Sequence, residues 1–341
     1  MVGDGCRRAE PVEDGKVPAL ERVKDITSDQ ASVTLRDYIE LLRPAQWVKN
    51  IVVFAGPAAA LRLSSAVSFG QAVVAFFAFC LVASASYAIN DVLDRRADAR
   101  HPTKRNRPVA RGVIRPPLAL GIACFLVAAS AIIATLLLSG RVTAVLLLYF
   151  AMTLAYSAAL KERVILDVII VSVGFVLRAW SGSLAVGVGT SEWLIACVFT
   201  LCLFMGFGKR RCELAMIADV NEAGQHRRTL LRYTPDLLNH LITVSAGIAV
   251  ITFLLYTMDT SGHPAPFHKE HLFYTLPLVV YGIFRYAMLT ELGVYAGPTE
   301  IVLRDRPLLA AVLLWAAVAL VIAYQVVLFG PEGLEGLVGA W

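Results

Sequence analysis

The chain has 341 residues, of which 57% are apolar and 17% charged, and its mean hydropathy is +0.66. Soluble globular proteins carry more charge, so this composition excludes an ordinary water-soluble domain and favours a membrane protein. The formal net charge is +5, and its meaning depends on where the basic residues lie.

The chain begins with a polar segment of mixed charge over residues 1–33, which contains Gly and Pro but no apolar core. A secretory signal peptide requires such a core. We therefore expect residues 1–33 to form a disordered cytoplasmic tail.

Nine apolar stretches that could cross a bilayer follow this tail. Pro57 interrupts the first of them, which makes it the least regular. The stretches cover residues 46–62, 68–90, 117–138, 142–160, 165–187, 192–207, 237–258, 272–290 and 307–329. Short polar gaps separate them, so we expect an all-α, polytopic membrane protein with one transmembrane domain over 34–330. A short non-cytoplasmic tail would follow over 331–341.

The basic residues predict how the chain is oriented in the membrane. Of 31 Lys and Arg, 26 lie in the tail and in the loops after even-numbered spans, and 3 lie on the opposite side. The positive-inside rule then places the N-terminus in the cytoplasm. Because the basic residues line one membrane face, we expect membrane lipids as partners and no nucleic acid.

The six cysteines form no CxxC pair and are expected to be free thiols.

Four oxygen-bearing side chains lie at the end of the second predicted span. Asn90, Asp91, Asp94 and Asp98 fall within about 100° of one another around a helix, and His101 joins the same face. Carboxylates this close repel one another unless a divalent cation lies between them. Their hard oxygen atoms favour Mg²⁺ shared with a substrate phosphate. The four residues are the candidate metal ligands, and Asp91 and Asp94 are also the candidate catalytic residues.

Basic side chains follow this acidic face beyond Pro102. Lys104, Arg105 and Arg107 could bind the outer oxygens of a diphosphate held by the metal. The alternative for the whole stretch is a solvated helix end of mixed charge. Such an end has no reason to place every acid on one face, so we favour the diphosphate site.

The stretch NDVLDRRAD (90–98) resembles the first Asp-rich motif of the UbiA superfamily of intramembrane prenyltransferases. That resemblance implies nine transmembrane helices and Mg²⁺ as the cofactor that binds a diphosphate substrate. The loop after the sixth span departs from the common pattern, because GKRRCEL (208–214) offers Lys209, Arg210 and Glu213 in place of a second DxxxD-like motif.

Four blocks together resemble one branch of the superfamily, the decaprenyl-phosphate phosphoribosyltransferases. They are RPAQWVKN (43–50), the acidic stretch to residue 108, LKERVILDVIIVSVGFVLR (160–178) and GKRRCEL. The resemblance implies that 5-phosphoribose passes from phosphoribosyl diphosphate (PRPP) to a polyprenyl phosphate, with release of diphosphate, in a bacterial plasma membrane. The lipid product would supply arabinose donors for cell-wall polymers. Tyr156 and Lys161, in the altered signal after the fourth span, join the substrate-binding candidates.

Two spans carry polar residues that could face a substrate cavity. Asp167 and Arg178 share one face of the fifth span, and a charge inside a membrane helix usually faces a cavity or a partner. The alternative is a structural ion pair that includes Arg178. At the start of the first span, Arg43 precedes Lys49 and Asn50. The latter two are expected to point inward, unless Lys49 extends to the lipid headgroups.

Arg304, in the last cytoplasmic loop, could close the site or merely anchor the ninth span.

The sequence leaves two other functions open. The chain could transfer a prenyl group from a prenyl diphosphate to an aromatic acceptor, which the missing second acidic motif disfavours. It could also be a transporter or a lipid-binding protein, but no internal repeat is visible. A homo-oligomer is compatible with the sequence.

Overall fold

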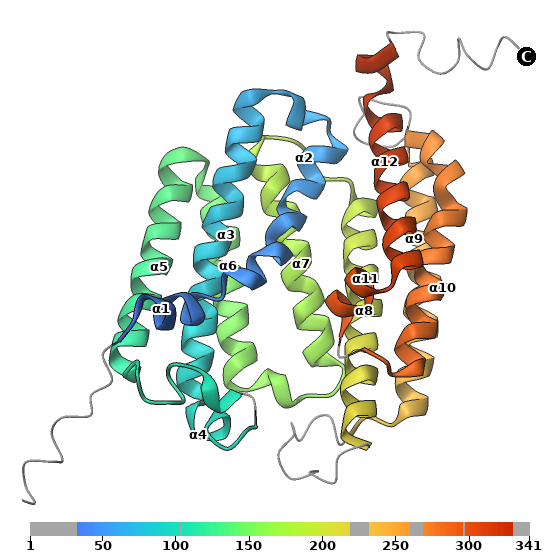
Figure 1. Cartoon of the computed structure of the whole chain (residues 1–341). Helices are drawn as coiled ribbons and strands as arrows, with labels where there is room; N and C mark the ends of the chain where they lie inside the picture. Colours follow the sequence, from blue (N-terminus) through green and yellow to red (C-terminus); the bar gives the residue numbers. More distant parts are fainter. Residues whose placement is uncertain (1–32, 103, 219–231, 260–268, 296, 330–341) are drawn as a thin grey trace, which may run out of the picture.

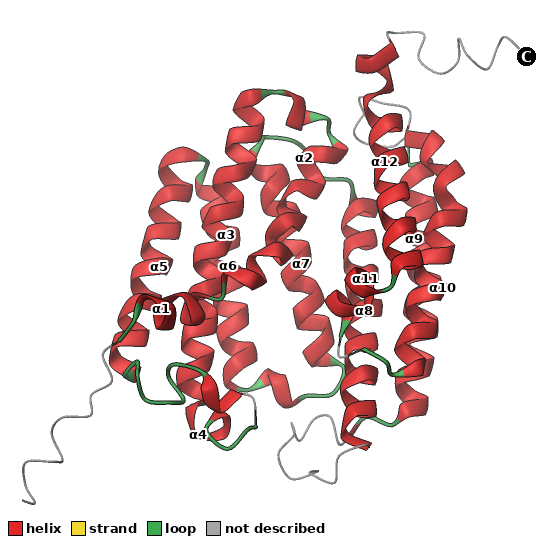
Figure 2. Cartoon of the chain, in the orientation of Figure 1, coloured by secondary structure: helices red, strands yellow, loops and turns green. Residues whose placement is uncertain are grey.

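The computed structural model describes residues 33–102, 104–218, 232–259, 269–295 and 297–329. Within these ranges every regular element is helical, and eight helices are long and apolar enough to cross a membrane (Figures 1 and 2). These eight are α3 (Ala66–Leu93), α5 (Pro116–Leu137), α6 (Gly140–Ala158), α7 (Leu166–Ala185), α8 (Glu192–Ala218), α9 (Pro235–Met258), η7 with α10 (Lys269–Thr275 and Leu276–Leu292) and α12 (Arg306–Phe329). The predicted all-α, multi-pass membrane fold is therefore confirmed. The predicted tails lie outside the described residues, except for residue 33.

The first predicted span is a broken segment rather than one α-helix. The short helix α1 (Leu35–Leu42) ends at Arg43, which has left-handed backbone angles (φ 52°, ψ 58°), and Pro44 starts the 3₁₀-helix η1 (Pro44–Phe54). The short helix α2 (Ala55–Ala59) continues it. A 3₁₀-helix rises about 2.0 Å per residue and an α-helix about 1.5 Å. These sixteen residues therefore extend over about 30 Å, enough to cross a hydrocarbon core.

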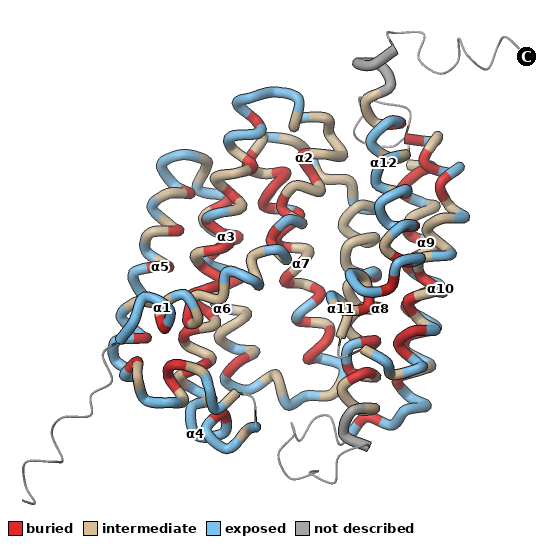
Figure 3. The backbone as a smooth tube through the Cα atoms, in the orientation of Figure 1, coloured by how far each residue is buried: buried red, intermediate tan, exposed pale blue. Residues whose placement is uncertain are grey.

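Two helices form the interior of the bundle. Buried positions are densest along α3 and α7, whereas the outer helices expose many apolar side chains (Figure 3). Helix α3 packs against α5, α6, α7 and η1, and α7 packs against α8, which leads to α9, α10 and α12. Exposed Phe125 (71%) and Leu136 (76%) on α5 suit contact with lipid tails.

The five described cysteines are free thiols, as expected.

Small residues allow η1 and α2 to lie directly against α7. A Cβ atom at Gly182 would lie 1.7 Å from the Val53 carbonyl oxygen, and one at Gly56 would lie 1.9 Å from the Ser183 Oγ. At Gly182 the obstacle is the backbone of η1, so glycine is required there. At Gly56 the main obstacle is the Ser183 hydroxyl, and the Ala179 carbonyl oxygen lies at 3.3 Å, so a side chain there would also crowd α7. Small residues commonly let helix backbones approach closely in membranes. This packing sets the position of η1, which carries Lys49 and Asn50.

We predict that Gly182→Ala destabilises the protein by about 1–3 kcal/mol, because the new methyl group would push η1 away from α7. Gly247→Ala is the matched control, since a Cβ atom on that α9 glycine meets nothing within 4 Å. Thermal unfolding of both purified variants in detergent provides the measurement. Equal melting temperatures for the two variants would contradict the proposed close contact.

Candidate active site

The acidic residues at the end of α3 form the first polar centre with basic residues from three other segments. Asp91 and Asp98 are buried, at 1% and 3% exposure. Arg43 donates to Asp91 Oδ1, and Arg107 Nη1 lies 3.1 Å from the same oxygen and 2.6 Å from Asp98 Oδ2. Asp94 pairs with Lys161, which lies on the short 3₁₀-helix η4 (Leu160–Glu162) between α6 and α7.

The predicted helical face does not continue unbroken through the motif. Helix α3 ends at Leu93, Asp94 has turn angles (φ −88°, ψ 0°), and the four-residue helix α4 (Arg95–Asp98) follows. Arg107 therefore joins Asp91 to Asp98, while Asp94 pairs separately with Lys161. Among the described residues, no group of three His, Cys, Asp or Glu side chains lies close enough together to bind a metal without further ligands.

One atom of this centre fits a bound cation. Asp91 Oδ2 is buried and accepts no hydrogen bond from the part of the chain that the structure describes. A buried carboxylate oxygen without a donor is costly, and a hard divalent cation is a suitable partner for it. Asn90 is half-buried on the last turn of α3 beside it. The donor set at this position is compatible with Mg²⁺.

The second polar centre lies where α7 begins and α8 nears its end. Arg210 Nε lies 2.8 Å from Asp167 Oδ2, and the same guanidinium pairs with Glu213. Lys209 Nζ lies 3.7 Å from Glu213 Oε1, and Tyr156 lies within electrostatic range of Arg210. This centre therefore holds two cations and two acids, all of them on α7 and α8. The first centre holds three acids, which lie at and just after the end of α3, and three cations from other segments.

Tyr233 holds the second centre in place, and the sequence analysis did not identify it. Ile165, a β-branched residue with positive φ (67°), precedes α7, and its backbone N–H donates to the Tyr233 oxygen at 2.6 Å. The Tyr233 hydroxyl donates to Asp167 Oδ1 at 2.8 Å. Burial raises the pKa of Tyr233, which keeps this donor protonated. A lone Tyr before a helix carries no motif, so no sequence signal marks it.

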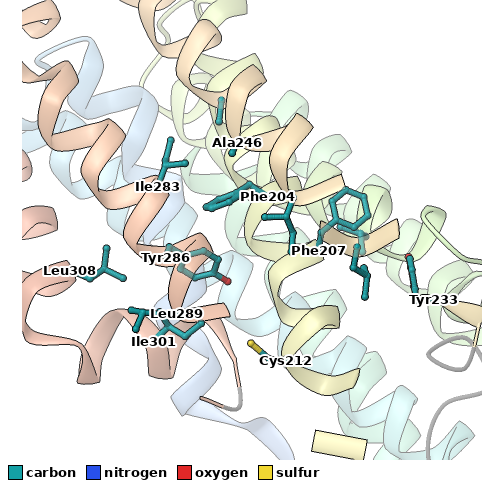
Figure 4. Packing of buried hydrophobic residues seen from close by; sticks show 14 residues of the cluster. Phe204, Phe207, Cys212, Tyr233, Ala246, Ile283, Tyr286, Leu289, Ile301 and Leu308 are labelled. Atoms are coloured by element: carbon teal, nitrogen blue, oxygen red, sulfur yellow. The ribbon is translucent and has the colours of Figure 1, made fainter. Parts of the chain in front are cut away.

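Tyr233 belongs to a buried cluster between α8, α9 and α10 that also contains Phe207 and Tyr286 (Figure 4). Its ring packs among apolar side chains while its hydroxyl reaches the start of α7. The cluster thus connects the packing of the second half of the bundle to the position of Asp167.

A third polar group lies deeper in the bundle. Arg178 donates to Asn50 Oδ1 at 2.7 Å, to the Gly174 carbonyl oxygen at 2.8 Å and to the Tyr149 hydroxyl at 2.7 Å. Asp167, on the same helix, instead pairs with Arg210. The structural ion pair considered for Asp167 and Arg178 is therefore not formed. Asn50 is 1% exposed.

The remaining candidate residues are half-buried or exposed. Lys104 donates its backbone N–H to His101 Nδ1 at 3.4 Å within the loop after α4, and Arg105 is exposed. Arg304, on the short helix α11 (Pro298–Arg304), is exposed and pairs with Glu300 on the same helix at 2.9 Å. Lys49 is half-buried and lies within electrostatic range of Arg178.

A multi-pass helical bundle with buried ion-pair centres at the ends of α3 and α7 defines an intramembrane enzyme. The chain belongs to the UbiA prenyltransferase family, whose model matches residues 51–293, and is accordingly a transferase. It is 33% identical over 319 residues to the decaprenyl-phosphate phosphoribosyltransferase of Corynebacterium glutamicum, covering 92% of this chain and 94% of that protein. It is 35% identical over 286 residues to the Mycolicibacterium smegmatis protein of the same name, covering 81% and 89%.

The fold also resembles a solved structure, a UbiA homologue from Archaeoglobus fulgidus bound to DMAPP and Mg²⁺. The TM-score is 0.64 at 16% identity, and the match covers 86% of this chain and 99% of that one. This likeness supports the arrangement of the helices.

We predict that Tyr233→Phe lowers the free energy of unfolding by about 1–3 kcal/mol, because the Ile165 N–H and the buried Asp167 carboxylate oxygen each lose a partner. Tyr286→Phe is the matched control. Tyr286 is buried in the same cluster, and its hydroxyl makes a 3.3 Å bond to the Met205 carbonyl oxygen. Thermal unfolding of both variants gives the comparison, and a larger loss in Tyr286→Phe would contradict the role assigned to Tyr233.

Proposed function

We propose that the protein transfers 5-phosphoribose from PRPP to a polyprenyl phosphate of the decaprenyl type, with Mg²⁺ as cofactor and release of diphosphate. The observation that carries this proposal is the buried oxygen Asp91 Oδ2, which accepts no hydrogen bond from the described residues and suits a metal-bound diphosphate. The second centre adds the cations Lys209 and Arg210, held by Asp167 and Glu213. PRPP has a diphosphate and a separate 5-phosphate, so it calls for additional cations. The names of the two bacterial relatives support the same reaction.

In this proposal, the metal ligands are Asn90, Asp91, Asp94 and Asp98. The buried oxygen Asp91 Oδ2 faces the cation, while Oδ1 stays with Arg43 and Arg107. A bound Mg²⁺ would neutralise the negative charge that develops on the departing diphosphate. Waters and diphosphate oxygens would complete its shell, as is common for this ion.

Basic side chains around the first centre would bind the diphosphate directly. Arg107 and Lys161 already lie against the acids, and a rearrangement of either side chain would place it on a phosphate oxygen. His101, Lys104 and Arg105 lie in the loop after α4 and would close over the same group. Arg210, held by Asp167, would bind the second phosphate of the donor with Lys209 and Tyr156. Arg304 would close the site from α11.

The reaction requires no strong base in the protein. The C1–O bond of PRPP breaks, its electron pair leaves with the diphosphate, and C1 becomes oxocarbenium-like. An oxygen of the lipid phosphate, already anionic, then forms the new bond to C1 from the opposite face. The protein contributes position and electrostatic stabilisation. The active site would face the cytoplasm, where PRPP is soluble, in a bacterial plasma membrane.

The decisive experiment incubates the purified protein in lipid nanodiscs with ribose-labelled PRPP, decaprenyl phosphate and Mg²⁺. We expect the label to enter the organic phase with equimolar diphosphate release, and chelation by EDTA to abolish both. A second assay offers the protein a prenyl diphosphate and an aromatic acceptor. If the ribose label stays in water and the aromatic acceptor is prenylated, the proposal is overturned in favour of prenyl transfer. Absence of both reactions would favour a transport or lipid-binding role.

We predict that Asp91→Asn and Asp94→Asn each lower the transfer rate by at least about 100-fold, because each removes a charge from the metal site. Asp236→Asn is the control, since Asp236 is an exposed acid at the start of α9. Initial rates at saturating PRPP and Mg²⁺ are the measurement. Near-normal Mg²⁺-dependent transfer by either variant would show that the substituted acid is not a metal ligand.

A further inference from the structure

Four basic side chains come from η1, from α7, from α8 and from the junction of α1 with η1. The 2.7 Å hydrogen bond between Arg178 and Asn50 brings α7 to the residue next to Lys49. Lys49 lies within electrostatic range of Lys209, Arg178 and Arg43. Arg43 pairs with Asp91, and Lys209 lies 3.7 Å from Glu213. In the described part of the chain, neither Lys49 nor Arg178 forms an ion pair with an acid. These two neighbouring positive charges are therefore not neutralised by the described residues.

The surroundings of Arg178 are neutral. Its N–H groups donate to the Asn50 side-chain oxygen, to the Gly174 carbonyl oxygen and to the Tyr149 hydroxyl. The rings of Phe79 and Phe175 flank the guanidinium, with their centroids 5.8 and 5.1 Å away. The side chain is only 5% exposed. A buried cation inside a membrane bundle is costly, and neutral donors and rings offset only part of that cost. Lys49 precedes Asn50 in η1 and adds a second positive charge near this one, and an anion bound between the two cations would offset the remaining cost.

Both cations lie deeper in the bundle than the acids. Arg178 follows Asp167 by eleven residues on α7, which places it about 16 Å further along the helix. Lys49 lies six residues beyond Arg43, about 12 Å along η1, which runs obliquely across the bundle from α1 toward α2 (Figure 1). The 2.7 Å hydrogen bond between Arg178 and Asn50 links the two segments at this depth. An anion bound there lies inside the membrane-spanning part, away from the metal-binding acids.

We propose that Lys49 and Arg178 form the binding site for the phosphate of the lipid acceptor, an inference that rests on the proposed function. A polyprenyl phosphate brings a phosphate monoester of up to two negative charges, which matches the two unneutralised cations. Its isoprenoid chain stays in hydrocarbon, and a phosphate held by Lys49 and Arg178 would face the donor from the membrane side of the acids. The donor diphosphate lies at the acids, which places the two phosphates on opposite sides of the ribose.

The test compares substrate affinities in Lys49→Met, which keeps the length of the side chain and removes its charge. We expect the KM for decaprenyl phosphate to rise about 10- to 100-fold, the effect of losing one charge-assisted contact, while the KM for PRPP changes less than about twofold. Arg141→Gln is the control, since Arg141 is exposed at the opposite end of α6 from Lys161. A rise in the KM for PRPP alone would overturn the inference and assign the pair to the 5-phosphate of the donor.

Direct binding separates this inference from the proposed reaction. Thermal stabilisation by decaprenyl phosphate, compared with uncharged decaprenol, reports on the phosphate site without PRPP. We expect stabilisation of the wild type by the phosphate only, and its loss in Lys49→Met and in Tyr149→Phe, which removes a partner of Arg178. If the wild type transfers no ribose but shows this pattern, the site stands and the reaction fails. If ribose transfer occurs and Lys49→Met keeps full stabilisation, the site fails and the reaction stands.

Discussion

The structure depends on the pairing of buried charges inside a bundle surrounded by lipid. Asp91 shows this constraint most clearly, because one of its oxygens accepts from both Arg43 and Arg107. Arg43 belongs to the junction of α1 and η1, and Arg107 to the loop after α4. One carboxylate therefore ties the broken first segment and the loop to the end of α3. Its second oxygen stays available for a cation, so the same residue serves the fold and the proposed chemistry.

The second centre follows the same rule with a different composition. Asp167 is held between Arg210 and Tyr233, and Tyr233 also bonds the strained backbone before α7. The cationic side chains of α8 are thereby fixed relative to α7, the helix that carries Arg178. Pairing each acid with one or two cations lets a membrane bundle hold two polar centres.

The broken first segment explains how polar residues reach the interior. A 3₁₀-helix covers more distance per residue than an α-helix, and Gly56 and Gly182 let it lie directly on α7. Lys49 and Asn50 are thus carried from the level of the acids toward Arg178. The proposed reaction uses this difference in depth, with the donor diphosphate at the acids and the lipid phosphate at the deeper cations. PRPP would enter from water and the polyprenyl phosphate from lipid. The donor diphosphate and the acceptor phosphate would then lie on opposite sides of the ribose.

The sequence alone determined the membrane fold, the eight regular spans and the resemblance of the acidic motif, because hydropathy and helical periodicity are local properties. It also indicated the basic residues after the sixth predicted span but placed them in a loop, which was wrong, because α8 continues to Ala218 and carries Lys209, Arg210 and Glu213 on a helix. Only the tertiary structure decided the partners, since those depend on which helices pack together. Arg178 bonds Asn50 rather than Asp167, Tyr233 supports Asp167, and Arg43 contacts Asp91 across 48 positions of the chain. The 3₁₀ geometry of the first span could not be recognised from its composition, because the segment packs against α7 at Gly182, a contact between residues far apart in the sequence.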